Sequence, residues 1–69
     1  MRRTPVSSST LRSVGYSPRS ATLEVEFTSG DVYRYFDVPI EVFDSLMSAG
    51  SLGRYFNARI RDRYRFAKR

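Results

Sequence analysis

The sequence predicts a small α+β domain in which a three-stranded antiparallel sheet packs against two helices. Residues 9–36 hold three runs with the alternating or β-branched composition of strands, separated by turn-forming residues. Residues 39–62 instead carry apolar side chains at spacings of three and four, the period of amphipathic helices. The chain has 69 residues, which is enough for one hydrophobic core but not for two.

The first two strands are expected at residues 9–16 and 23–28. The first alternates weakly and is followed by the sequence SPRS, in which Pro18 favours a turn. The second, LEVEFT, alternates strictly between apolar and polar side chains. This strict alternation indicates a strand with one buried face.

The third strand, in the sequence VYRYF, is expected to form a hairpin with the second in one of two registers. A two-residue loop would pair Val25 with Arg34 and place a guanidinium on the apolar face. A three-residue loop, with Gly30 in the left-handed conformation, pairs Val25 with Tyr33 and places Arg34 beside the glutamates of the second strand. Because burying an unpaired charge is costly, we expect the second register, with Tyr33 and Tyr35 on the core-facing side.

Two helices are expected after the hairpin. The first begins with Pro39 at its first position and ends before Gly50, since proline favours helix starts and glycine favours helix ends. The second has Ser51 as its cap and ends near Asp62. Their apolar stripes, which predict packing on the sheet, are Ile40, Phe43, Leu46 and Met47 in the first helix and Leu52, Phe56 and Ile60 in the second.

Charge is distributed unevenly along the chain, whose net charge is +5. Residues 1–20 carry +4, residues 21–53 carry −5 and residues 54–69 carry +6. On the second helix, Arg54 and Arg61 fall opposite the apolar stripe, and Arg65 joins them if the helix continues, which predicts a basic ridge. A surface with segregated charge attracts a polyanion, whereas the alternative is that the basic end only solubilises the protein.

The ends of the chain are expected to lie outside the domain. Residues 1–5 are expected to be a flexible basic N-terminus, residues 6–66 the single domain, and residues 67–69 a basic tail. Residues 64–66 are expected to be extended and to offer a short fourth strand. The N-terminus lacks the apolar segment of a signal peptide, and no apolar run approaches the roughly 20 residues of a membrane span. We therefore expect a cytoplasmic protein that does not associate with membranes.

The chain lacks the side chains of most catalytic sites. It has no histidine and no cysteine, hence no imidazole base, no thiolate and no Ser-His-Asp triad. Two carboxylate pairs, Glu24 with Glu26 and Glu41 with Asp44, are expected on solvated surfaces. The glycines match neither a phosphate-binding loop nor a dinucleotide fingerprint. We therefore expect a binding module that is not an enzyme and holds no metal or cofactor.

Arginines alternate with aromatic residues in the last sixteen positions. Guanidinium groups bind phosphate oxygens, and aromatic rings stack on unpaired bases, so this composition fits a surface for RNA or single-stranded DNA. The same pattern also fits a helix with aromatic residues in or beside the core and arginines on its solvent-exposed face. Both interpretations stay open. The candidate nucleic-acid-binding residues are Arg54, Arg59, Arg61, Arg63, Arg65, Lys68, Tyr33, Tyr35 and Tyr64.

Several short motifs occur in an order and spacing typical of one known domain. They are Ser8-Ser9, Val14-Gly15-Tyr16, Tyr33-Arg34-Tyr35, Val38-Pro39, and Ala49-Gly50-Ser51 followed by Gly53 and Tyr55-Phe56-Asn57. From about Val6 to Phe66 the chain resembles the KTSC domain, a module that is appended to the C-terminus of some lysyl-tRNA synthetases and also occurs alone in short bacterial proteins. The resemblance implies RNA as a partner through the synthetase context. It implies no synthetase activity, because the chain lacks a synthetase catalytic domain.

Two hypotheses of function follow. The leading one is a module that binds RNA, either tRNA-like or single-stranded, through the arginine-rich second helix and tail. The alternative is a protein-interaction or self-assembly module, including a homodimer, in which the acidic middle of one molecule meets the basic end of another.

Overall fold

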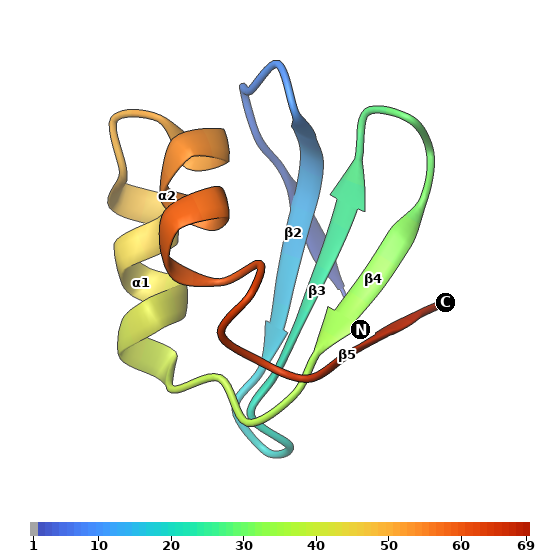
Figure 1. Cartoon of the computed structure of the whole chain (residues 1–69), viewed down its shortest axis with the longest axis vertical. Coiled ribbons are helices and arrows are strands. Elements are labelled where there is room, and N and C mark those ends of the chain that lie inside the picture. Colours follow the sequence, from blue (N-terminus) through green and yellow to red (C-terminus); the bar gives the residue numbers. More distant parts are fainter. Residues whose placement is uncertain (1) are drawn as a thin grey trace.

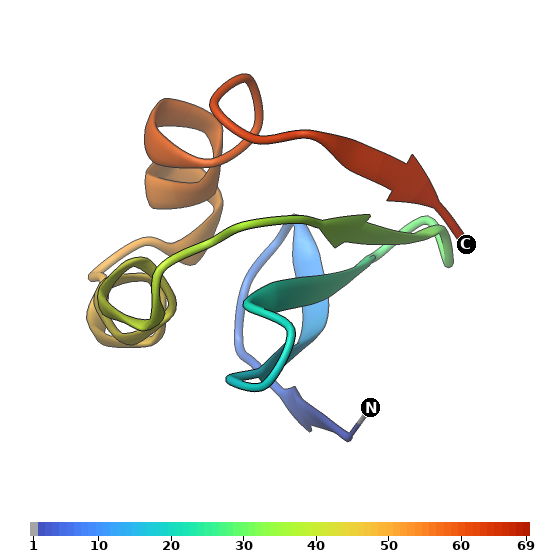
Figure 2. The ribbon, with the colours of Figure 1, turned by 90° about the horizontal axis from the view of Figure 1, so that it is seen from below.

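The computed structural model describes residues 2–69. Five antiparallel strands form one sheet in the order of the sequence, and both helices lie on the same side of it (Figures 1 and 2). None of the helices in residues 2–69 combines the length and the apolar character needed to cross a membrane. The elements are β1 (Arg3–Pro5), β2 (Leu11–Ser17), β3 (Thr22–Phe27), β4 (Val32–Tyr35), α1 (Ile40–Ser48), α2 (Leu52–Arg59) and β5 (Phe66–Lys68).

The sheet has five strands where the sequence predicted three or four. β1 occupies the N-terminus that was expected to be flexible, with Thr4 opposite Val14 of β2. β5 extends through the expected basic tail, with Ala67 opposite Arg34 of β4. Each edge strand has only three residues, which is too short for an alternating pattern to reveal it in the sequence. Backbone pairing to the neighbouring strand holds each of them in the sheet.

The predicted register of the β3–β4 hairpin is confirmed. Val25 pairs with Tyr33. Gly30 has a φ of 98°, the left-handed conformation that the three-residue loop needs. The Phe27 amide donates a hydrogen bond to the Asp31 carbonyl at 2.9 Å, which closes the loop. Tyr33 and Tyr35 therefore face the core side of the sheet.

The hydrophobic core lies between the sheet and the helices. Leu46 of α1 and Phe56 of α2 are buried, and Ile60 is buried just after α2, as the apolar stripes predicted. Ile40, however, is 45% exposed. Pro39 caps α1 instead of occupying its first position, so Ile40 lies at the very start of the helix, ahead of the turns that contact the core.

The start of α2 is as predicted, but its end comes earlier. The Ser51 hydroxyl accepts a hydrogen bond from the Arg54 amide at 3.3 Å and caps the helix. The helix ends at Arg59 instead of near Asp62, and the amides of Ile60 and Arg61 both donate to the Phe56 carbonyl at 3.0 Å. The chain then turns, so Arg61 leaves the predicted outer ridge.

Candidate nucleic-acid interface

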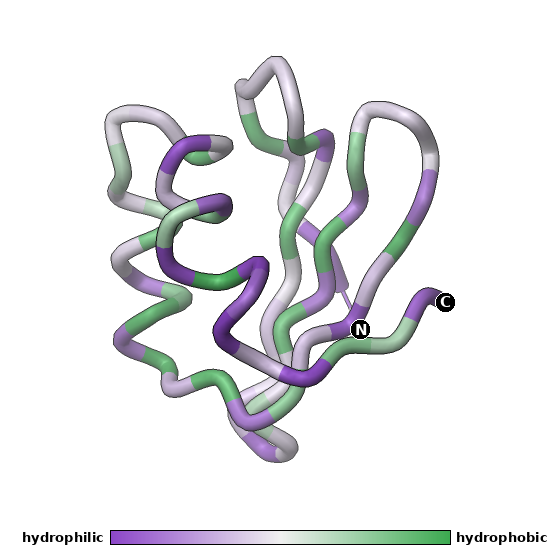
Figure 3. The backbone as a smooth tube through the Cα atoms, in the orientation of Figure 1, coloured by the Kyte–Doolittle hydropathy of each residue, from purple (hydrophilic) through white to green (hydrophobic). Residues whose placement is uncertain are grey.

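Four of the candidate arginines lie on α2 and the turn that follows it, a stretch we call the arginine segment (residues 54–63). All four are exposed, and no ion pair within residues 2–69 engages them. Figure 3 shows hydrophilic residues along α2 and this turn. The four arginines of the segment are Arg54, Arg59, Arg61 and Arg63.

The two remaining basic candidates lie just before and within β5, and each is paired with an aspartate. Arg65 contacts Asp37 at 3.2 Å, and its guanidinium carbon lies 5.6 Å from the centre of the Phe36 ring. Lys68 contacts Asp31 at 3.4 Å. Both pairs are exposed, so water competes for each partner and the pairs contribute at most about 1 kcal/mol.

The outer side of the sheet, away from the helices, holds a second group of arginines around Glu24. This carboxylate was expected on a solvated surface, but it is fully buried. Arg34 Nε lies 2.8 Å from it, Arg3 Nη1 lies 2.5 Å away and Arg69 Nη1 lies 3.4 Å away. Arg3 comes from β1 and Arg69 follows β5, so side chains from both edges of the sheet meet over its central strand.

The charge of Glu24 is preserved by these arginines. Burial pushes the pKa of Glu24 up, but hydrogen bonds from Arg34 and Arg3 and the charge of Arg69 outweigh burial and hold the pKa below its usual value of 4.5. Nearby, Arg12 contacts Glu26 at 3.5 Å. We call Glu24, Glu26 and these four arginines the outer-face network. Each of its four arginines therefore already has a carboxylate partner within the chain.

Five aromatic rings line a cleft of about 610 Å³ whose lining residues come mainly from α2 and the turn after it, from the β3–β4 hairpin and from β5. We call it the aromatic cleft. Its rings are Phe27, Tyr33, Tyr35, Phe56 and Phe66, and its polar lining includes Asn57, Arg61, Asp62 and Asp31.

The two candidate tyrosines of β4 differ in accessibility. Tyr35 is 3% exposed, and its ring packs edge-on against Phe56 with centroids 5.4 Å apart. Its ring faces are therefore not open to a stacked base. Tyr33 is half-buried and lies between Phe27 and Phe66, with centroid distances of 5.5 and 5.6 Å.

Phe66 is the exposed aromatic ring of the cleft and was not among the candidates. It is 56% exposed and lies 5.6 Å from both Tyr33 and Tyr35. The sequence pattern that could have identified Phe66 is the alternation of arginines and aromatic residues, in which Phe66 directly follows Arg65. Sequence spacing could not show that β5 would bring Phe66 beside β4.

Arg61 is the candidate arginine that joins the arginine segment to the aromatic cleft. Its Nη1 donates a hydrogen bond to Asn57 Oδ1 at 3.5 Å. Burial raises the pKa of the Tyr35 hydroxyl, against the opposing charge of Arg61, so this hydroxyl is neutral at physiological pH. Tyr64 is half-buried and packs against the core, apart from the residues that line the cleft.

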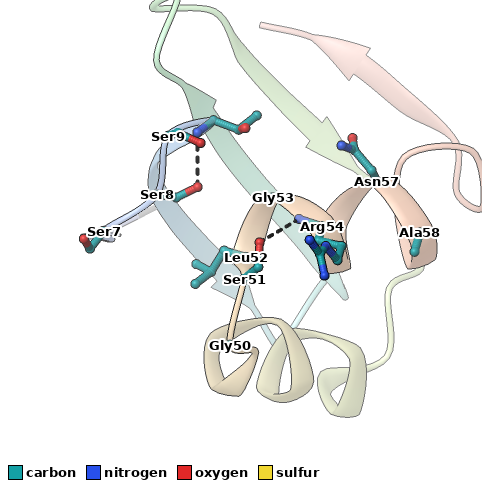
Figure 4. A pocket seen from close by; sticks show the side chains of 11 residues that line it. Ser7, Ser8, Ser9, Gly50, Ser51, Leu52, Gly53, Arg54, Asn57 and Ala58 are labelled. Atoms are coloured by element: carbon teal, nitrogen blue, oxygen red, sulfur yellow. Dashed lines mark hydrogen bonds between the residues drawn. The ribbon is translucent and has the colours of Figure 1, made fainter.

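A second cleft, of about 640 Å³, lies where the serine-rich loop before β2 meets the start of α2 (Figure 4). The Ser8 hydroxyl accepts hydrogen bonds from the amides of Thr10 and Leu11 at 3.1 and 3.3 Å. A Cβ atom at Gly53 would lie 3.0 Å from Thr10 Oγ1. Two motifs that are distant in the sequence thus pack closely together, which gives both an architectural role.

Comparisons with known proteins agree with this fold and with the motifs. Residues 7–64 match the family described as the KTSC domain. A crystal structure of a KTSC domain protein from Yersinia pestis superposes with a TM-score of 0.97 at 38% identity, covering 99% of this chain and 96% of that one.

Sequence relatives include both small proteins and a much larger enzyme. An uncharacterized protein from Stutzerimonas stutzeri is 56% identical over 57 residues, which is 83% of this chain and 80% of that protein. A lysine–tRNA ligase from Nostoc punctiforme is 40% identical over 58 residues, which is 84% of this chain and 10% of the ligase. By its motifs, its fold and these similarities, the chain belongs to the KTSC domain family.

Proposed function

We propose that this protein is a non-catalytic module that binds RNA, either tRNA-like or single-stranded, through the arginine segment. The observation that carries the proposal is the set of four exposed arginines that lack an ion pair within residues 2–69. Such guanidinium groups bind phosphate without first breaking an internal ion pair. The similarity to part of a lysine–tRNA ligase, an enzyme named for a tRNA substrate, supports RNA as the polyanion.

The alternative, a protein-interaction or self-assembly module, relied on an acidic middle that meets a basic end. Four of the six acids in residues 21–53 have basic partners within the chain. These acids are Glu24, Glu26, Asp31 and Asp37. Fewer carboxylates are therefore left to attract a partner protein, which favours the RNA proposal.

A salt titration with tRNA and with a single-stranded oligoribonucleotide tests the proposal. Each phosphate contact contributes about 0.7 to the log–log salt slope for single strands, so four arginines predict a slope of about −3. The double variant Arg54→Gln with Arg59→Gln is expected to reduce this slope by about 1.4.

A matched control removes one exposed and unpaired arginine elsewhere. Arg19 lies in the β2–β3 turn, at the lower end of the sheet in Figure 1 and away from α2. We expect Arg19→Gln to leave the salt slope of the wild type almost unchanged, whereas Arg59→Gln should reduce it. Equal effects of the two substitutions would mean that only net charge matters, and no binding at low salt would refute the proposed function.

A further inference from the structure

We infer that the aromatic cleft receives one unpaired base of an RNA strand whose phosphates contact the arginine segment. This inference rests on the proposed function and assigns a separate part of the surface to the base. It predicts that the protein prefers single-stranded or looped RNA to a fully paired duplex, because bases in a duplex are stacked on one another and closed to the cleft.

The walls of the cleft offer a ring on which a base can stack. Phe66 is 56% exposed, and Tyr33 supports it from the side at a centroid distance of 5.6 Å. An exposed phenylalanine held in place by a neighbouring ring is the usual platform for base stacking in proteins that bind single strands. Tyr35 lies behind these rings and fixes their position, since its own centroid is 5.6 Å from that of Phe66.

The polar groups of the cleft suit the edge of a neutral base. Asn57 and Arg61 line the cleft on the α2 side and present amide and guanidinium groups. Tyr35 and Asp62 line the same cleft and add a hydroxyl and a carboxylate to its lining residues. The cleft therefore combines residues that carry hydrogen-bond donors and acceptors with a stacking ring, the two components of base recognition.

The charges of the cleft favour a base over a phosphate as its occupant. Asp62 lines the cleft without an ion pair within residues 2–69 and repels a phosphate group, whereas Asp31, which also lines it, is paired with Lys68. Arg61, which also lines the cleft, belongs to the arginine segment. A strand that places its phosphates on the arginine segment can therefore turn one base inward at Arg61.

The test measures binding of a labelled single strand about ten nucleotides long, of the same strand with abasic residues, and of a duplex of equal length. We expect the abasic strand to bind on the order of tenfold more weakly than the intact strand, because stacking of one base is lost. We expect Phe66→Ala to weaken binding of the intact strand by a similar factor and to change binding of the abasic strand little.

Ile40→Ala is the matched control, because Ile40 is the other large hydrophobic residue that is exposed within residues 2–69, at 45%, and it does not line the cleft. Thermal unfolding of both variants shows whether either substitution lowers the stability of the fold. Arg61→Gln provides a second variant at an exposed position, and we expect it to reduce the preference for intact over abasic RNA.

The outcomes separate this inference from the proposed function. Equal affinity for intact and abasic strands, with an unchanged salt slope, would refute the cleft as a base site and leave the arginine segment as an RNA surface. Loss of all RNA binding at low salt would refute both. Adenosine monophosphate that binds as tightly as the strand, or a dimer abolished by Phe66→Ala, would assign the cleft to a free nucleotide or to a second copy instead.

Discussion

The outer-face network and the arginine segment hold four arginines each, but these are in opposite electrostatic situations. In the outer-face network, the arginines surround Glu24 and Glu26, and the carboxylate of Glu24 is fully buried. In the arginine segment, no acid within residues 2–69 forms an ion pair with any of the four. The number of arginines alone therefore does not identify a binding surface in this protein.

The two sets of arginines therefore contribute to different properties, the first to folding stability and the second to binding. An arginine beside a buried carboxylate stabilises the fold, because removing it leaves the buried charge with one partner fewer and no water in its place. An exposed arginine without a partner contributes little to folding and remains available for an external anion. Substitutions in the first set should change stability, and substitutions in the second set should change binding.

The largest expected effect is on Glu24. Replacing it by glutamine (Glu24→Gln) leaves three arginines facing a neutral amide, and we expect the free energy of unfolding to fall by about 3 kcal/mol. This is the low end of the range for broken buried pairs, because Arg34 and Arg69 are 40% and 57% exposed and regain water. Urea unfolding measures the loss. Glu41→Gln, at an exposed position on α1, is the control, and equal stability of the two variants would contradict the network.

The lowered pKa of Glu24 predicts how the stability of the fold depends on pH. Because the pKa of Glu24 is lower in the folded chain than its usual value of 4.5, the unfolded chain binds more protons in the range just below pH 4.5. The contribution of Glu24 is therefore fully present above pH 4.5 and is lost as the pH falls through the folded pKa. We expect the free energies of unfolding of wild type and Glu24→Gln to converge as the pH falls through this range. A constant difference between them would contradict the lowered pKa of Glu24.

An intermediate effect is expected at Gly15, over which β1 passes. A Cβ atom at this position would lie 2.6 Å from the Arg2 carbonyl oxygen and 3.1 Å from Arg3 Cγ. We expect Gly15→Ala to displace β1 from Glu24 and to cost about 1–3 kcal/mol in unfolding experiments. Gly50→Ala, where a Cβ atom would meet no atom within 4 Å, is the matched control. A Gly15→Ala protein as stable as the control would show that β1 does not depend on this close approach.

The smallest effect on stability is expected in the arginine segment. Arg59→Gln should change the free energy of unfolding by no more than about 0.5 kcal/mol, because this arginine is exposed and unpaired. Arg34→Gln should be clearly more destabilising, since Arg34 Nε lies 2.8 Å from Glu24. RNA titrations on the same two proteins should show the reverse order. If Arg59→Gln proved the less stable variant, the distinction between the two sets would be wrong.

The sequence identified many residues of the candidate site, but it did not show which of them lie together in the fold. The alternation of residues 54–66 identified the four arginines, and the strand pattern placed Tyr33 and Tyr35 on the core side. The sequence could not separate the unpaired arginines from Arg65 and Lys68, which meet Asp37 and Asp31 across the fold. It also missed Phe66, whose exposure depends on where β5 lies beside β4.

The hairpin register, the cap of α2 and the core-facing side of each helix could be predicted from the sequence, because local periodicity and turn chemistry specify them. Which charged side chains form ion pairs depended instead on the tertiary structure. Glu24 was predicted to lie on a solvated surface, since it alternates with apolar residues in β3, yet arginines from β1, from β4 and from the end of the chain cover it. Ion pairs between residues far apart in sequence have no local pattern, so the partner of each charge is set by how the strands associate.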